Sequence, residues 1–277
     1  MHREKTTVLP SFRVATAALR MLPAFSIISV ERAGTTSLYR YLCQHTRIGE
    51  AFRKEVHYFD MNHGRGVGWY RAHFPSRAWS RWSALRRGGP GITGEASPYY
   101  LYHPHVPARM AELLPDVKLV ALVRNPVERA YSHYHLNVRQ KKETLSFEDA
   151  LEHEEERLAG EWEKLVADPG YWSHAHYTFA YRARGLYAQR LEEWHKHFAP
   201  ERILVVRSED LYADPASVVA RVFQHLELPD FRPEGFKAYN QKPYPGLSAD
   251  TRRGLARFFE PHNQRLYELL GRDLGWT

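Results

Sequence analysis

The sequence predicts an α/β fold, in which helices cover both faces of a central parallel sheet. Three segments carry this prediction. Residues 25–30 are short, apolar and β-branched, and a glycine-containing loop and a helical pattern over 35–44 follow them. Residues 117–123 form a continuous apolar run, which is typical of a strand buried on both faces. A third strand pattern, over 202–206, follows a helical segment at 186–198. Strands that alternate with helices favour a parallel sheet.

Capping residues predict where the other helices begin. Asn125 is a good N-cap, Pro126 suits the first helical position and Glu128 completes a capping box, so we expect a helix from there to about residue 140. Further helices are predicted to begin near residues 146, 214 and 248, and the first of them is strongly acidic through residue 156. The region 61–92 is rich in Gly, Arg and Trp and is predicted to be loop with short helices. Two prolines make 241–246 irregular.

The composition bounds the size of the fold and the kind of partner. The chain has 277 residues, 43% of them apolar, so we expect a single domain over 24–277 after an N-terminal arm or short helix over 1–23. A formal net charge of +7 favours anionic partners. The single cysteine, Cys43, excludes an intrachain disulfide and a cysteine-based metal cluster. Arg20 and Pro23 interrupt the apolar stretch over 14–30, which is shorter than the ~20 residues of a membrane-spanning helix. We therefore expect no membrane anchor and a cytoplasmic protein.

The loop between the first strand and its helix is the first candidate site. Backbone N–H groups at the start of a helix attract anions, and Gly34 lets the chain approach one closely. Arg32 adds a fixed positive charge with several donors. The strand, loop and helix therefore form a P-loop-like phosphate-binding unit, and a capped helix with surface threonines is the alternative interpretation. The candidate anion-binding residues are Arg32, Ala33, Gly34, Thr35, Thr36 and Ser37.

A second candidate site follows the strand at 117–123. Arg124 ends this strand, at the edge of the sheet where open α/β folds bind ligands. Ser132 lies about two turns into the next helix, on a face that can look back at the strand end. An arginine and a hydroxyl suit a terminal phosphate. The alternative interpretation is an arginine paired with a nearby carboxylate.

Together the two motifs resemble the sulfotransferases that use 3′-phosphoadenosine 5′-phosphosulfate (PAPS). The resemblance rests on a strand leading into R-x-G-T-T-S and on a second strand ending in R-x-P-x-x-R-A-x-S. The chain is similar to the heparan sulfate N- and 3-O-sulfotransferases and their bacterial counterparts from about residue 24 to residue 276, including the closing segment 271–276. The resemblance implies that the first loop holds the 5′-phosphosulfate, and that Arg124 and Ser132 hold the 3′-phosphate. It implies that Lys242 and Tyr244 belong to a loop that closes over the nucleotide.

The same resemblance implies adenosine 3′,5′-bisphosphate (PAP) as the product and a mechanism that needs no metal. Relatives often carry Lys where Arg32 stands. Because a guanidinium stays protonated, Arg32 is expected to stabilise charge in the catalytic set but to be a poor proton donor. His103 and His105 lack a further ligand pattern, so no metal site is predicted.

Residues 54–60 supply a candidate base. The string Lys-Glu-Val-His-Tyr-Phe-Asp places a carboxylate and an imidazole two residues apart, and in an extended segment both would point to one face. The segment resembles K-E-x-H-[FY]-F of the heparan sulfate enzymes, which implies Glu55 as general base with Lys54 and His57 beside it. An exposed Glu–Lys pair on a strand is the alternative interpretation. The segment 94–98 resembles one that lines the acceptor side.

The predicted reaction is in-line transfer of a sulfuryl group from PAPS to a hydroxyl or amine of an acceptor. The acceptor is a small molecule, glycan, lipid, secondary metabolite or carrier-bound intermediate. A P-loop nucleotide kinase is a rival hypothesis, but the chain lacks the G-x-x-x-x-G-K-[ST] pattern. A non-catalytic anion- or nucleic-acid-binding module is compatible with the net charge. The chain shows no basic strand interleaved with aromatic residues, so no nucleic-acid partner is expected.

Overall fold

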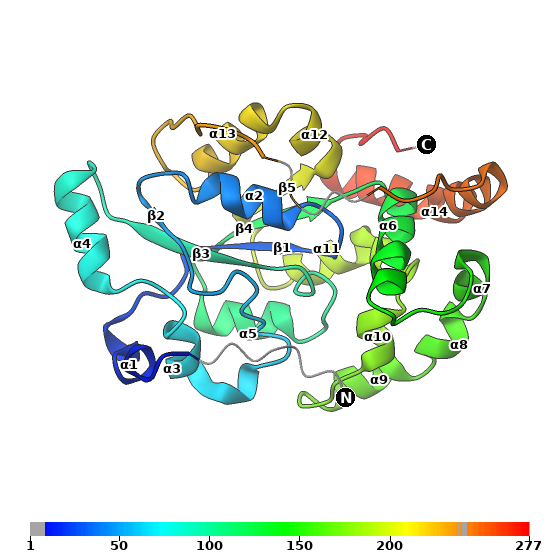
Figure 1. The fold of residues 1–277 in the computed structure, drawn as a ribbon, viewed down its shortest axis with the longest axis horizontal. Helices are drawn as coiled ribbons and strands as arrows, with labels where there is room; N and C mark the ends of the chain where they lie inside the picture. The colour runs from blue at the N-terminus through cyan, green and yellow to red at the C-terminus, as the bar shows by residue number, and fades with distance from the viewer. Residues whose placement is uncertain (1–8, 238, 240–242, 277) are drawn as a thin grey trace.

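Five parallel strands form the sheet, in the order β2-β3-β1-β4-β5 (Figure 1). The computed structural model describes residues 9–237, 239 and 243–276. β1 is the central strand, and because helices cover both faces of the sheet, all of its residues are buried. The strands are β1 (Phe25–Ser29), β2 (Ile48–Gly49), β3 (Ile92–Ser97), β4 (Lys118–Val123) and β5 (Ile203–Arg207).

Helices cover both faces of the sheet, as predicted (Figure 1). One face carries α2 (Thr35–Leu42) and α13 (Pro215–His225), and the other carries α5 (Val106–Leu113) and α11 (Tyr187–His195). The chain leaves β1 toward one face, whereas the connections after β3 and β4 run over the other. The carboxyl end of β1 is therefore the switch point at which open α/β sheets bind ligands.

The remaining helices surround this sandwich. α14 packs against α6 and α11, while α1, α3 and α4 lie at the opposite end of the molecule (Figure 1). Their bounds are α1 (Ser11–Ala15), η1 (Ala17–Leu19), η2 (His63–Arg65), α3 (Gly66–Arg71), α4 (Arg77–Arg86), α6 (Pro126–Arg139), α7 (Phe147–Glu152), α8 (Glu154–Leu158), α9 (Glu161–Ala167), α10 (His174–Thr178), η3 (Ala183–Gly185), η4 (Pro200–Arg202), α12 (Ser208–Ala213) and α14 (Ala249–Leu270). Among the described residues, no helix is both long enough and apolar enough to span a membrane.

Strand β3 was absent from the sequence prediction. Its residues, Ile-Thr-Gly-Glu-Ala-Ser, lack an apolar run, yet five of the six are buried. Gly94 is required there, because a Cβ at this position would lie 2.4 Å from the Phe25 ring on β1. Glu95 is buried as well and accepts hydrogen bonds from Tyr70, Ser97 and Tyr100. Local hydrogen bonding, rather than hydrophobicity, makes this segment an interior strand.

Two predicted helices differ in detail from the structure. The Asn125 side chain caps α6 by accepting from the N–H groups of Val127 and Glu128, as predicted. The capping box does not form, because the Glu128 carboxylate accepts from Arg252 and the Asn125 N–H donates to Glu209 instead. The acidic segment is two short helices, α7 and α8, and not one.

The core surrounds the sheet. Buried aliphatic side chains from all five strands pack against aromatic residues of the helices, among which Trp194 of α11 is fully buried. Cys43 follows α2 and is only partly exposed, and burial, together with the nearby Glu50 carboxylate, raises the pKa of its thiol to about 12. The described residues thus form a single α/β domain.

Candidate active site

A pocket of about 1450 Å³ opens at the carboxyl ends of β1 and β4. The loop after β1 forms one wall and α6 forms another. Most residues singled out from the sequence line it, including those of both predicted motifs. Its lining includes Arg32, Gly34, Thr35, Thr36, Ser37, Glu55, Arg124, Ser132 and Tyr244.

The loop after β1 has an unusual backbone. Arg32 has φ +74° and Gly34 has φ +96°, so two residues of one short loop lie in the left-handed region. This region is open to glycine but costly for other residues, which indicates that the surroundings hold Arg32 in place. The Ser208 hydroxyl donates to the Ala33 carbonyl at 2.5 Å, which ties the loop to α12. Thr35, Thr36 and Ser37, the first residues of α2, line the pocket, and N–H groups at the start of a helix attract anions.

Arg32, Arg124 and Ser132 come together although they are up to 100 residues apart in sequence. Arg32 Nε donates to Ser132 Oγ at 2.9 Å, and Arg124 Nη1 donates to the Arg32 carbonyl at 2.9 Å. Burial, then the charges of Arg139 and Arg124, lower the pKa of Arg32. Three guanidinium groups therefore crowd one wall of the pocket, and an anion with several negative charges would relieve their mutual repulsion.

This cluster fits a nucleotide bisphosphate. The resemblance assigned Arg32 and Ser132 to opposite phosphates of PAPS, whereas here they contact each other directly. A guanidinium has donors on several edges, so Arg32 can lie between two phosphate positions. Arg139, at the end of α6, was not predicted. The only signal in the sequence was that Arg139 follows Arg124 by the length of one helix.

Aromatic side chains border the nucleotide side of the pocket. The Tyr244 ring stacks on His135 of α6, with ring centroids 4.7 Å apart, and meets Tyr131 edge-on. Tyr239 N–H donates to Ser37 Oγ at 3.4 Å, so Tyr239 lies beside the start of α2. Tyr244 therefore lines the pocket, and Lys242 lies outside the described residues.

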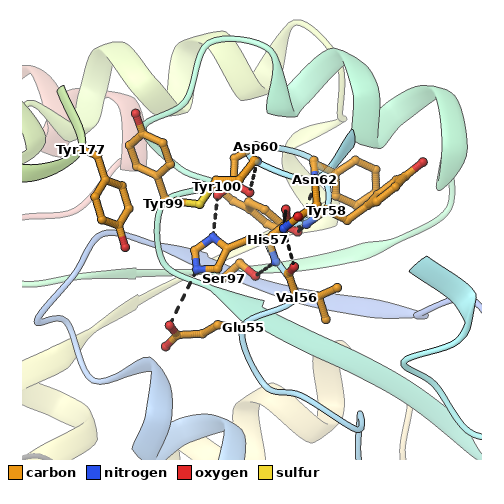
Figure 2. A network of polar contacts seen from close by, with 12 residues as sticks. Glu55, Val56, His57, Tyr58, Asp60, Asn62, Ser97, Tyr99, Tyr100 and Tyr177 are labelled. Carbon is orange, nitrogen blue, oxygen red and sulfur yellow. Dashed lines mark hydrogen bonds and ion pairs between the residues drawn. The ribbon is translucent and has the colours of Figure 1, made fainter. Parts of the chain in front are cut away.

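The opposite side of the pocket holds the candidate base. Figure 2 shows Glu55, His57 and Asp60 in one row. His57 Nδ1 lies 2.7 Å from Asp60 Oδ2, and His57 Nε2 lies 3.8 Å from Glu55 Oε2, an ion-pair distance that is too long for a hydrogen bond. Lys54 Nζ donates to Glu55 Oε1 at 2.5 Å. The sequence pattern paired Glu55 with His57 but did not indicate Asp60, which is the last residue of the same segment, 54–60.

The predicted geometry of this segment was wrong in one respect. His57 is not extended, but has φ +53°. Three hydrogen bonds hold this left-handed backbone: its N–H donates to Ser97 Oγ, its carbonyl accepts from Asn62, and its ring pairs with Asp60 (Figure 2). Glu55 and His57 meet because the chain turns, and not because a strand repeats every two residues.

Charges in this row support one another. Burial acts to lower the pKa of His57, but Asp60 and Glu55 outweigh it and raise the pKa to about 10. Burial likewise acts to raise the pKa of Glu55, but His57 and Lys54 outweigh it and lower the pKa to about 2. At neutral pH, His57 is a cation and Glu55 is an ionised carboxylate that is about one-third exposed to the pocket.

A buried ion pair links the two sides of the pocket. Glu31, directly before Arg32, lines the pocket and pairs with Arg184, whose side chain is fully buried. The Arg184 guanidinium also lies 4.9 Å over the Tyr99 ring and donates to the Tyr177 carbonyl at 2.5 Å. Neither residue was predicted, although a carboxylate inside a phosphate loop signals that a cation must lie nearby.

The parallel sheet, the loop at its switch point and the cation cluster define a nucleotide-dependent group transferase. A model of the family described as Sulfotransferase domain matches residues 22–239. The chain therefore belongs to the sulfotransferase domain family, a class of PAPS-dependent enzymes, which favours this prediction over a nucleotide kinase. Among the described residues, no group of three or more His, Cys, Asp or Glu side chains is arranged to hold a metal ion.

Individual relatives agree with this family. Mouse heparan sulfate glucosamine 3-O-sulfotransferase 3B1 is 30% identical over 94% of this chain and 66% of its own length. Membrane-associated sulfotransferase kil1 of Dictyostelium discoideum is 27% identical over 93% of this chain and 67% of its own. The chain thus spans about two thirds of the length of these curated relatives. The crystal structure of a sulfotransferase from Alicyclobacillus acidocaldarius has a TM-score of 0.67 and 32% identity, over 92% of this chain and 98% of the other.

Proposed function

We propose that this protein transfers a sulfuryl group from PAPS to a hydroxyl of a polyhydroxylated, sugar-like acceptor, with Glu55 as general base. The observation that carries the proposal is the pocket itself. A cluster of guanidinium groups lies on one side of it, and an ionised carboxylate held by a histidine and a lysine lies on the other. PAPS supplies an activated sulfuryl group, and the protein supplies position and charge.

The nucleotide would be held by the loop after β1 and by the cation cluster. The N–H groups at the start of α2 and the hydroxyls of Thr35, Thr36 and Ser37 suit the 5′-phosphosulfate. Arg124 and Ser132 suit the 3′-phosphate, and Arg32 stabilises negative charge between them. The ring of Tyr244 would cover the nucleotide from the side of α6.

Glu55 would accept the proton of the acceptor hydroxyl as the new S–O bond forms. His57 Nε2 is buried and faces the Glu55 carboxylate, and together with Lys54 it keeps this carboxylate ionised. A carboxylate with a pKa of about 2 is a weak base. Its basicity would rise when the acceptor displaces the Lys54 ammonium.

The acceptor side of the pocket is polar, which supports a polyol. Its lining beyond Glu55 offers amide, hydroxyl and cationic groups that can bond to several hydroxyls. The mouse relative, heparan sulfate glucosamine 3-O-sulfotransferase 3B1, is named for a glucosamine acceptor. These acceptor-side residues are Gln140, Lys142, Tyr177 and Thr178.

Calorimetric titration with PAP tests the nucleotide site. We expect Arg124→Ala to weaken PAP binding by about 1.5–3 kcal/mol, the usual contribution of hydrogen bonds to charged groups. Arg202→Ala is the control, because Arg202 lies at the amino end of β5, away from the pocket. No PAP binding by the folded wild type would contradict the proposal. Incubation with sulfur-labelled PAPS and a panel of sugars, aliphatic alcohols and amines then tests the acceptor class.

The proposal includes cytoplasmic residence, where PAPS is synthesised. Cell fractionation of the native chain tests it, and recovery of the untruncated protein from the medium would contradict it.

A further inference from the structure

Helix α4 (Arg77–Arg86) presents a face that the transferase site does not explain. It lies at the end of the molecule opposite α7 and α8, far from α6 on the pocket wall (Figure 1). Its inner side is fixed by Trp79, which packs so closely on the neighbouring backbone that a Cβ at Gly49 or Gly91 would lie within 2.9 Å of the indole. The helix is therefore firmly attached, and its outer side is a defined surface.

An apolar stripe runs along that outer side. Ala78, Trp82 and Leu85 recur at i, i+4 and i+7, so they lie on one line of the helix. All three are exposed, Trp82 at 46% and Leu85 at 84%. Soluble surfaces carry single exposed apolar residues, but an exposed stripe at helical spacing marks an interaction site.

Arginines flank the stripe on both sides. The helical spacing places Arg77 and Arg81 along one side and Arg86 along the other. None of these three forms an ion pair with any residue that the structure describes. The wider segment between Asp60 and Glu95 contains six arginines and no carboxylate. This face is therefore strongly positive.

We propose that this face of α4 binds the surface of an anionic lipid bilayer. Trp82 and Leu85 would enter the boundary between headgroups and acyl chains, and the arginines would contact acidic headgroups. A soluble polyanion needs only the arginines and would leave Leu85 exposed to water. A second copy of this chain would bring two positive faces together.

Docking in this orientation leaves the pocket free. α4 precedes β3 and so lies near the amino ends of the strands, whereas the pocket lies at their carboxyl ends. The face therefore acts independently of the sulfuryl transfer reaction, and its variants separate membrane binding from nucleotide binding.

Co-sedimentation of the full chain with vesicles tests the proposal. We expect the wild type to bind vesicles of phosphatidylcholine with phosphatidylserine, but not phosphatidylcholine alone. The double variant Arg81→Gln/Arg86→Gln lowers partitioning by more than tenfold, at about fivefold per arginine. Trp82→Ser/Leu85→Ser also lowers it by more than tenfold, although it keeps the charge. The control Arg253→Gln/Arg257→Gln on α14 removes the same charge from exposed positions and changes partitioning by less than about threefold.

Three outcomes would overturn the proposal. In the first, the wild type binds neither kind of vesicle. In the second, the α14 control variant weakens binding as much as the α4 arginine variant does. In the third, Trp82→Ser/Leu85→Ser binds vesicles like the wild type, which would make the face a site for soluble polyanions. All variants should keep the circular dichroism spectrum and the PAP affinity of the wild type, because the altered side chains are exposed and do not line the pocket. A wild type that fails to bind PAP would contradict the proposed function and leave this inference standing.

Discussion

His57 connects the charges on the acceptor side of the pocket. One ring nitrogen faces Asp60 and the other faces Glu55, so the buried imidazolium is balanced by two carboxylates. Its left-handed backbone is the local cost of this arrangement. In the proposed reaction, the ionised Glu55 accepts a proton only after the acceptor hydroxyl has become acidic through bond formation to sulfur.

Replacing Glu55 by Gln tests this role. The amide keeps the size of the side chain but accepts no proton, so we expect kcat to fall by about 10²–10⁴-fold while PAP affinity stays within about twofold. Steady-state kinetics with a labelled donor measures the change. Glu50→Gln is the matched control, because Glu50 is an exposed carboxylate paired with Arg40. Unchanged turnover in the Glu55 variant would show that another group takes the proton.

The imidazolium also predicts how stability depends on pH. The folded-state pKa of His57, about 10, lies above its ordinary value of 6.5, so the stabilisation is complete below pH 6.5 and is lost as the pH rises toward 10. The free energy of unfolding should fall across this window by at most ~1.4 kcal/mol per pH unit for the one proton. Urea denaturation at a series of pH values measures it.

Asp60→Asn provides the comparison for this pH series. Without the Asp60 charge, His57 should lose its proton at lower pH, and the fall in stability between pH 6.5 and 10 should be smaller than in the wild type. Equal slopes in the two proteins would mean that other groups cause the dependence. The effect of Glu55 has the opposite sign, because its lowered pKa gives stability that is lost only as the pH falls from about 4.5 toward 2.

At the scale of elements, the loop after β1 is shaped by its glycine. Gly34 combines φ +96° with a close neighbour, because a Cβ there would lie 3.0 Å from the Tyr212 hydroxyl oxygen. Backbone strain and contact both oppose a side chain. A glycine at this position therefore favours the backbone that brings the start of α2 to the pocket.

Gly34→Ala is expected to weaken PAP binding more than it weakens folding. We expect at least a tenfold increase in the Kd for PAP, and a loss of about 1–3 kcal/mol in unfolding free energy from strain. Titration calorimetry and urea denaturation measure the two effects. Gly254→Ala serves as a control, because nothing lies near its Cβ position on α14. A variant with wild-type PAP affinity would show that the loop backbone does not bind the nucleotide.

The elements that the sequence predicted are those with strong local patterns. Apolar runs marked β1, β4 and β5, and capping residues marked the starts of α6 and α13. β3 was not predicted, because its buried glutamate and glycine are typical of a loop. The break between α7 and α8 was not predicted either, because no proline or glycine lies there. Glu55, His57, Arg124 and Ser132 were found through motifs. Asp60, Arg139, Glu31 and Arg184 depend on contacts that only the folded chain creates.

At the scale of the whole molecule, the pocket joins parts of the chain that are distant in sequence. Arg184, between α10 and α11, neutralises Glu31 in the loop after β1, and the Tyr239 N–H donates to Ser37 of α2. A nucleotide in this pocket would contact the ends of the sheet, α6, Tyr239 and Tyr244 together. Its binding should therefore stabilise the entire fold and not one loop.

Thermal unfolding with PAP tests this expectation. PAP at about 100 times its Kd should add ~2.7 kcal/mol to the unfolding free energy, which raises Tm by roughly 4–6 °C for a chain of this size. The transition should stay single and cooperative. A second transition that PAP leaves unshifted would mean that part of the chain unfolds independently of the nucleotide site.

The environment of the one sulfur nucleophile, Cys43, has a practical consequence. A thiol whose pKa is about 12 is almost wholly protonated at neutral pH, and maleimides and iodoacetamides react with thiolates. Cys43 should therefore react very slowly with such reagents. A cysteine introduced at an exposed position such as Leu85 would then be the only residue labelled by a thiol-reactive fluorophore. A polarity-sensitive dye placed there would report the approach of α4 to lipid in real time, without removal of the native cysteine.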